Sequence, residues 1–333
     1  MSEREMKAYC GWIKNREELV QSASGGIFYC LAKCVIEAGG YVAGAIYTDS
    51  YKSVHHILTN DIDEIKKMRG SKYSQSNYHD VTMQILDKCN SGSPILFSGT
   101  PCQCFVLKQK VKNNNLICLE LICNGVQDHR ILESEIERYE KEICARITYY
   151  TMRYKKDNRQ LPIYVRAEFE NNAVIEEQLY STVLGRIYGS RLALQTSCYN
   201  CRFKGLSRSG DITLGDYRGF KSLKKASIEK AGASTIIINS QKGSQLLEQI
   251  KDEINLIPAK NLREVIYSNS RIVISGCKPA DKDIRDFWSL LDEKGIEEAA
   301  HVSDKYLSRI RNKIIRIIDR ILLIKYMFAN KLM

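Results

Sequence analysis

Apolar residues in the first 146 positions fall into two alternating patterns. Short runs at 94–99 and 115–123 are apolar almost throughout, which is typical of strands covered on both faces. Each run precedes a stretch, at 100–112 and 129–143, whose apolar residues recur with helical spacing. This alternation predicts βαβ units and a mostly parallel sheet. The remaining elements expected here are helices at 22–40 and 79–92, a short charged helix from 61, and strands at 41–48 and 54–59.

From residue 147 the pattern becomes a regular alternation of apolar and polar residues. Segments 147–154, 163–170 and 173–180 alternate in this way, which predicts antiparallel strands with one exposed face. A helix near 182–194 then leads to a loop rich in cysteine, glycine and basic residues. The last elements expected are strands at 211–217 and 234–240 and a helix at 243–253.

We therefore predict an α/β protein in which helices flank a mostly parallel sheet, with an added antiparallel β region and a C-terminal amphipathic helix. One domain is expected over 1–300, with an α/β half at about 1–146 and a cysteine-loop half at about 147–300. A basic helical tail is expected at 301–333.

The tail repeats apolar residues every three or four positions, at 307, 310, 314, 317, 321, 324 and 328. Ile315, Ile318, Leu322 and Leu323 widen this apolar face beyond a coiled-coil seam. Basic residues lie off the stripe or at its flank: Arg309, Arg311, Lys313, Arg316 and Arg320. Such a helix can lie in an anionic membrane interface. The alternative is a helix packed on its own domain or on a second copy, which would make a homo-oligomer.

Charge and hydropathy narrow the class of protein. The formal net charge is +11, and the tail, with eight Lys or Arg and two Asp or Glu, contributes +6 of it. A mildly basic body excludes the broad basic face of a nucleic-acid binder. The N-terminus has no apolar signal region, and no apolar stretch approaches the ~20 residues of a membrane span. We expect a cytoplasmic protein, peripheral on the inner face of the membrane if the tail binds there.

Twelve cysteines in a reducing compartment are core residues or metal ligands rather than a disulfide framework. Cys198 and Cys201, in the segment CYNC, can ligate one metal ion or one edge of a cluster. A redox pair or a structural role are the alternatives. Cys102 and Cys123 follow neighbouring predicted strands and should meet at one sheet edge. Four thiolates there suit zinc and an iron–sulfur cluster equally well.

The other cysteines fall into two groups. Cys30, Cys34, Cys104 and Cys118 occupy positions where the pattern already favours an apolar core residue. The isolated cysteines are Cys10, Cys89, Cys144 and Cys277.

Three turns could contact an anionic ligand. SASGG (22–26) and SGTPC (98–102) each open a helix, whose N-terminus can hold a phosphate; a plain helix cap is the alternative. RGSKY (69–73) places two cations and a phenol in one loop, which a solvated turn would equally explain.

A family resemblance is carried by six segments in order: SASGG, MRGSKYSQS, LFSGTPCQ, LICNG, SCYNCRFKG and DITLGD. They resemble the β-subunit family of coenzyme F-420 hydrogenases and dehydrogenases, and the similarity runs from about Cys10 to the region of 288. Members bind FAD and a 4Fe–4S cluster and pass electrons between a two-electron carrier or substrate and the cluster. The family includes a plant reductase that acts on a chlorophyll side chain. Similar bacterial members often accompany surface-polysaccharide synthesis.

The resemblance assigns residues by their place in these segments. It implies that the cluster ligands are Cys102, Cys123, Cys198 and Cys201. The implied flavin contacts are Ser24, Gly25, Gly26, Arg69, Ser71, Lys72, Tyr73, Ser98, Gly99 and Thr100. Gly215 and Asp216 match the family's GD pair, to which no role is assigned.

The sequence also departs from its relatives. Many bacterial members begin with a ferredoxin-like module that carries two cysteine clusters, and this sequence has none, so we expect no second cluster. Asn124 stands where relatives commonly have His, which removes a proton donor. Cys104 stands where an apolar residue is usual, which supports its assignment to the core.

The leading hypothesis is an FAD and iron–sulfur oxidoreductase with a small-molecule substrate and an electron donor or acceptor, either a protein or a reduced carrier. No catalytic acid or base is identified; His79 and His129 are available, but a lone His is more often structural. The alternative is a non-enzymatic, zinc-stabilised interaction protein at a polysaccharide-assembly membrane. A third hypothesis keeps the fold but assigns no redox activity, because the flavin site has decayed.

Overall fold

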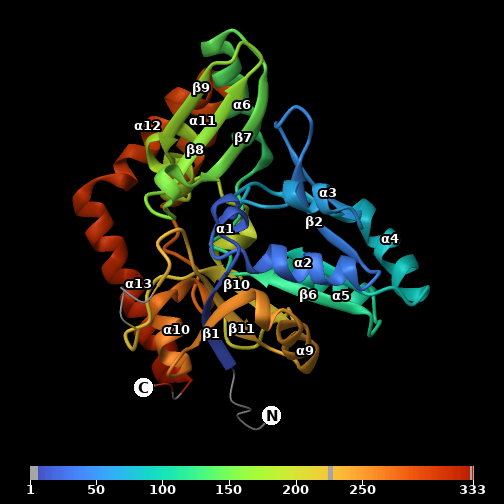
Figure 1. Cartoon of the computed structure of the whole chain (residues 1–333). Coiled ribbons are helices and arrows are strands. Elements are labelled where there is room, and N and C mark those ends of the chain that lie inside the picture. The colour runs from blue at the N-terminus through green and yellow to red at the C-terminus, as the bar shows by residue number, and fades with distance from the viewer. Residues whose placement is uncertain (1–6, 224–227, 331, 333) are drawn as a thin grey trace.

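The computed structural model describes residues 7–223, 228–330 and 332, and for 309–312 it describes the helical backbone alone. The chain forms a large sheet and a small sheet with helices around both (Figure 1). The strands are β1 (Lys7–Ile13), β2 (Tyr41–Tyr47), β3 (Val54–Thr59), β4 (Ser76–Asn77), β5 (Ile95–Gly99), β6 (Leu116–Leu121), β7 (Ile147–Tyr154), β8 (Tyr164–Phe169), β9 (Val174–Gln178), β10 (Ile212–Asp216), β11 (Ser234–Ile238) and β12 (Ile254–Pro258). The α-helices are α1 (Arg16–Gln21), α2 (Ile27–Glu37), α3 (Ile62–Lys67), α4 (His79–Asn90), α5 (Pro101–Lys110), α6 (His129–Ile143), α7 (Val183–Ser190), α8 (Thr196–Tyr199), α9 (Gln241–Gln249), α10 (Leu262–Ser268), α11 (Asp281–Lys294), α12 (Ile296–Leu307) and α13 (Arg309–Ala329).

The large sheet has the strand order β12-β1-β11-β10-β6-β5-β2-β3-β4. Its centre is parallel, because β10, β6, β5 and β2 pair in one direction. Antiparallel pairs extend it on both sides, and β4 pairs in parallel with β3. The central strands are covered on both faces, so that Ile95, Leu96 and Phe97 of β5 are fully buried. The predicted α/β class is confirmed, including the parallel pairing of neighbours β5 and β6.

The small sheet, with the order β7-β8-β9, is antiparallel throughout, as the alternating pattern predicts. Val165, Ala167 and Phe169 of β8 pack into a core shared with helices α6, α7, α11 and α12. Figure 1 shows this layer above the large sheet. Helix α6 therefore packs on strands that follow residue 147, whereas β10, β11 and β12 complete the large sheet. The domain boundaries near 146 and 300 stay predictions.

Three parallel strands, β5, β6 and β10, end at the same edge of the large sheet. Strand pairing places Asp216 of β10 beside Ser234 of β11, and Ser234 beside Gly11 of β1, so the segment between β1 and α2 begins at this edge too. Arg153 of β7 reaches from the small sheet to Asp216. In open α/β sheets, ligands bind in the crevice at the carboxyl ends of the strands.

The C-terminal residues form two helices, α12 and α13, whereas the apolar stripe from 307 to 328 predicts a single one. Position 307 belongs to α12, and Ser308 adopts an extended backbone between the helices. The Ser308 hydroxyl donates to the Lys305 carbonyl oxygen, a local bond that competes with helix continuation. The predicted side-chain positions Arg309, 310 and Arg311 lie outside the described residues. Among the helices described, none combines the length and apolar content that a membrane span requires.

Candidate functional site

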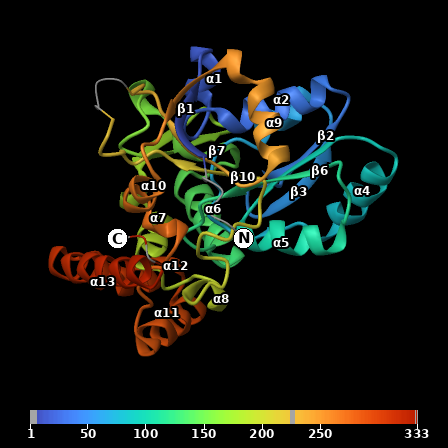
Figure 2. The same cartoon turned by 90° about the horizontal axis from the view of Figure 1, so that it is seen from below.

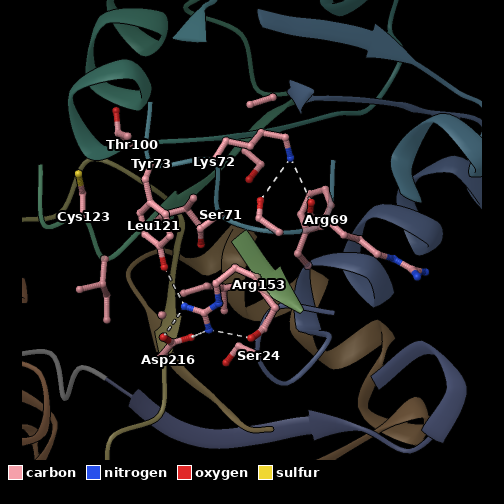
Figure 3. A pocket seen from close by; sticks show the side chains of 18 of the residues that line it. Ser24, Arg69, Ser71, Lys72, Tyr73, Thr100, Leu121, Cys123, Arg153 and Asp216 are labelled. Carbon is pink, nitrogen blue, oxygen red and sulfur yellow. Dashed lines mark hydrogen bonds and ion pairs between the residues drawn. The ribbon is translucent and has the colours of Figure 1, made fainter. Parts of the chain in front are cut away.

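A cavity of about 420 Å³ lies where the carboxyl ends of the parallel strands face the small sheet (Figure 3). This volume is typical of small-molecule and cofactor sites. Nine of the ten predicted flavin contacts line it: Ser24, Gly26, Arg69, Ser71, Lys72, Tyr73, Ser98, Gly99 and Thr100. The GD pair, Gly215 and Asp216, lines it as well.

Gly25 does not line the cavity, and close packing explains why a glycine stands there. Its backbone N–H donates to Ser234 Oγ at 2.9 Å. A Cβ at this position would lie 2.3 Å from the carbonyl oxygen of Gly11. Any side chain would therefore push the turn away from the sheet. Gly26 next to it has a φ of +77° and is the N-cap of α2, a left-handed conformation that favours glycine.

A buried lysine that follows β7 stabilises the turn containing Ser24. Lys155 Nζ donates to the carbonyl oxygens of Leu19 at 2.6 Å and Ser24 at 2.7 Å. Ser24 Oγ donates to the Ala233 carbonyl oxygen at 2.6 Å. Burial lowers the pKa of Lys155 to about 7. These bonds fix the backbone that opens α2 toward the cavity.

The RGSKY turn is arranged differently from the free cationic loop that its sequence indicates. Lys72 is buried, and its Nζ donates to four carbonyl oxygens, the shortest of these bonds being 3.1 Å to Arg69. Burial lowers the pKa of Lys72 to about 7. Arg69 is paired with Glu18 and lies 4.0 Å above the Tyr29 ring. The Arg69 and Lys72 side chains therefore stabilise the turn through contacts within the protein.

The SGT turn joins β5 to α5 as a helix cap. Thr100 is the N-cap of α5, and its backbone N–H donates to Gln103 Oε1 at 2.9 Å. His56 lies behind the turn, where its Nε2 is 3.1 Å from the Ser98 carbonyl oxygen and its ring stacks on Phe97. Burial lowers the pKa of His56 to about 4, so the imidazole is neutral at physiological pH. His56 lines the cavity, whereas His79 and His129 do not.

The floor of the cavity is a buried ion pair that sequence reasoning missed. Arg153 donates through two nitrogens to Asp216, at 2.9 and 2.8 Å, and also to Tyr73 Oη at 3.0 Å and the Ala23 carbonyl oxygen at 2.7 Å (Figure 3). Gln160 donates to both Asp216 and Ser24. Arg153 belongs to an alternating strand, and no local motif marks it. The pairing with Arg153 gives a structural role to Asp216, the aspartate of the GD segment.

A second, smaller cavity of about 40 Å³ brings the predicted ligands together: Cys102, Cys123, Cys198 and Cys201 all line it. It adjoins the large cavity, because both are lined by Thr100, Cys123, Gly125, Val126 and Arg271. Cys102 is exposed and the other three are partly buried. Burial raises the pKa of Cys123 to about 11 and also raises that of Cys198. Of the four cysteines predicted to be core residues, Cys30, Cys104 and Cys118 are buried and Cys34 is partly buried; two of the isolated ones, Cys10 and Cys89, are buried as well.

Cations surround the thiol cavity. Lys204 donates to the carbonyl oxygens of Cys123 and Arg271, and burial lowers its pKa to about 8. Arg208 and Arg271 also line this cavity. Arg191 donates to the backbone and side-chain oxygens of Asn124, at 3.0 and 2.9 Å. Asn124, the departure from the family pattern, is therefore held by an arginine beside Cys123.

No three Cys, His, Asp or Glu residues in the described part of the chain are arranged to hold a single metal ion. One zinc ion with Zn–S bonds of about 2.3 Å needs thiolates within about 4 Å of each other. A cubane cluster places irons and sulfides between its thiolates and so needs them farther apart. The four cysteines share one cavity without the arrangement that a single ion requires, and four thiols are also the donor set of a cubane cluster.

The sequence matches a known protein family, and the fold is similar to a solved structure. A family model for the C-terminal part of the coenzyme F-420 hydrogenase/dehydrogenase beta subunit matches residues 92–261, about half of the chain. A chain of the F-420-reducing nickel–iron hydrogenase complex from Methanosarcina barkeri is similar in structure, with a TM-score of 0.55 and 16% identity over 82% of this chain and 91% of that chain. At that identity the likeness shows the fold alone. No curated protein matches the chain.

Proposed function

Since the chain belongs to the coenzyme F-420 hydrogenase/dehydrogenase β-subunit family, we propose that it is a flavin-dependent oxidoreductase that passes electrons between a two-electron carrier or substrate, FAD and one 4Fe–4S cluster. The observation that carries the proposal is the shared wall of the two cavities. Cys123 and Thr100 line both, so a group in the large cavity and a group between the cysteines would be direct neighbours.

Cys102, Cys123, Cys198 and Cys201 would hold the cluster. Their thiols are protonated in the free protein where burial raises the pKa, so cluster binding would release protons. The cations Lys204, Arg208 and Arg271 would then compensate the negative charge of four thiolates. Arg208 is also paired with Glu120 and Arg271 with Asp319, and these ion pairs keep both guanidinium groups beside the cavity.

The flavin would occupy the large cavity, with the Ser24–Gly26 and Ser98–Thr100 turns as its polar contacts. The two turns open α2 and α5. Helix α5 begins with Pro101 and is already capped by Thr100 and Gln103, whereas α2 has no side-chain cap, so the first backbone N–H groups of α2 suit the pyrophosphate. When bound, FAD supplies the exchange between hydride and single-electron transfer. Two contacts keep the cavity walls in place: the tilted ring pair of Tyr73 and Tyr188, with centroids 4.6 Å apart, and the Arg153–Asp216 ion pair.

The proposal extends to the setting in which the protein acts. The resemblance to bacterial relatives favours a small-molecule substrate in surface-polysaccharide synthesis and an electron donor or acceptor as partner. The same proposal assigns residues 1–300 to the catalytic unit and residues 301–333 to the tail.

Metal and flavin analysis of one anaerobically purified sample tests the proposal. We expect about four irons and four sulfides per chain, together with FAD and a brown colour. A colourless protein with one zinc and no flavin would overturn it in favour of the zinc-stabilised interaction protein. Cluster without flavin would support the third hypothesis, the same fold without redox activity because its flavin site has decayed.

A further inference from the structure

The apolar stripe of the C-terminal helix faces solvent. Ile314, Ile317, Ile321, Ile324 and Phe328 recur every three or four positions on α13, and their side chains are 40–73% exposed. Figure 2 shows α13 at the edge of the molecule. A contiguous set of large exposed apolar side chains on a folded protein marks an interaction surface.

The opposite side of α13 attaches the helix to the body. Leu323 and Met327 are buried in a core with residues of β1, β11 and α10. Tyr326 Oη accepts a hydrogen bond from the Leu206 backbone N–H at 3.2 Å, and Arg271 donates to Asp319 Oδ2 at 2.5 Å. With 3.6 residues per turn, positions 319, 323, 326 and 327 lie on one side of the helix and the stripe lies on the other. Docking on the body therefore leaves the stripe uncovered.

The charges beside the stripe have one sign. Lys313, Arg316, Arg320 and Lys325 are all exposed. Lys313 and Arg320 follow one flank of the stripe and Lys325 the other, whereas Arg316 lies nearer the attached side. The single acidic residue from 313 to 328 is Asp319, which faces the body and is paired with Arg271. Lysine and arginine stems can lie along apolar surface while their charged ends reach outward.

We propose that α13 lies in the interface of an anionic membrane, with the stripe at the boundary of the acyl chains and the four basic residues among the headgroups. This inference goes beyond the proposed redox function and does not depend on it. A second copy fits the face less well, because self-pairing would bring two sets of basic residues together without an acidic partner. An anionic headgroup layer complements both the charge and the apolar stripe.

Flotation of the purified full chain with lipid vesicles tests the stripe. We expect binding to vesicles of phosphatidylcholine mixed with phosphatidylglycerol, and at least tenfold weaker binding by Ile317→Ser/Ile321→Ser. The matched control is Met83→Ser/Val174→Ser, which replaces two exposed apolar residues on other elements and should bind as wild type does. Deletion of the tail is a poorer test, because it would also remove Leu323 and Met327 from the core. Unchanged thermal unfolding shows that each variant is folded.

The charge requirement is tested separately. Each basic residue at an anionic surface contributes about a fivefold affinity, so Arg316→Gln/Arg320→Gln should bind about thirtyfold more weakly. Lys110→Gln/Lys112→Gln makes the same charge change on another surface and should bind normally. Equal binding to pure phosphatidylcholine, or no binding to either vesicle, would overturn the proposal. A wild-type dimer that Ile317→Ser/Ile321→Ser converts to a monomer, without vesicle binding, would assign the face to a second copy instead.

Discussion

The guanidinium of Arg153 forms a bidentate ion pair with the carboxylate of Asp216, with N–O distances of 2.9 and 2.8 Å. The arginine belongs to the small sheet and the aspartate to the carboxyl end of a central strand of the large sheet. The pair therefore joins the two sheets directly beneath the cavity. The arginine side chain is almost fully buried, so water cannot replace the carboxylate as its partner.

Asp216→Asn should lower the free energy of unfolding by about 3–5 kcal/mol, because it leaves the buried Arg153 charge uncompensated. Urea unfolding followed by circular dichroism measures this. The control is Asp304→Asn, which breaks the exposed pair with Arg186 and should cost about 1 kcal/mol or less. Equal losses of unfolding free energy in the two variants would show that breaking the buried pair costs no more than breaking the exposed one.

The Arg153–Asp216 pair should also affect how the free energy of unfolding falls at acid pH. Burial raises the pKa of Asp216, but the Arg153 guanidinium outweighs it and holds the pKa below its ordinary value. Its stabilising contribution is therefore complete above the unfolded pKa of about 3.9 and is lost as pH falls through the folded pKa. Asp216→Asn should flatten the loss of stability below about pH 4 relative to wild type. An unchanged acid limb would show that Asp216 does not titrate differently on unfolding.

Lys72 should make stability rise with pH. Its pKa is about 7 in the folded protein, whereas an unfolded lysine titrates near 10.4. Between these values the unfolded state binds one proton more, so the free energy of unfolding increases with pH. Lys72→Met should reduce that slope by about 1.4 kcal/mol per pH unit between about pH 7.5 and 10. The exposed Lys110→Met is the control, and a wild-type slope in Lys72→Met would contradict the prediction.

Cys123→Ala should abolish iron binding, because three thiolates remain in the smaller cavity. Iron and sulfide analysis of anaerobic samples measures it. The matched control is Cys104→Ala, two positions after Cys102 but buried in the core, which should keep its iron and lose only about 1 kcal/mol of stability. Retention of a full cluster in Cys123→Ala would remove this residue from the ligand set.

Lys204→Gln should lower the reduction potential of the proposed cluster by tens of millivolts, since it removes a positive charge beside Cys123 whose interaction with the cluster is worth on the order of 1 kcal/mol. A redox titration measures the potential, and iron content shows that the cluster is retained. The control is Lys112→Gln, because Lys112 precedes β6 whereas Cys123 follows it, at the other end of the strand. An unchanged potential in Lys204→Gln would mean that the lysine does not act on the cluster.

Much of the architecture follows from local pattern. Fully apolar runs identify the central parallel strands, and alternation identifies β7, β8 and β9, because burial on two faces or one sets the period of apolar residues. The strand-end positions of Cys102 and Cys123 follow from the same reasoning. The turns at 22–26, 69–73 and 98–102 were identified from their residues as possible anion contacts, and a resemblance assigned them to a flavin. The structure brings residues of all three to one cavity.

Tertiary structure decided what depends on contacts between distant residues. Arg153 is an ordinary position of an alternating strand until Asp216, 63 residues later, pairs with it. Arg69 and Lys72 look like free cations until Glu18 and the backbone of their own turn engage them. The sequence by itself determined that the tail has an apolar stripe, because helical periodicity is local. Only the packing decided that the body binds the other side of that helix, through Leu323, Met327 and Asp319, and leaves the stripe exposed.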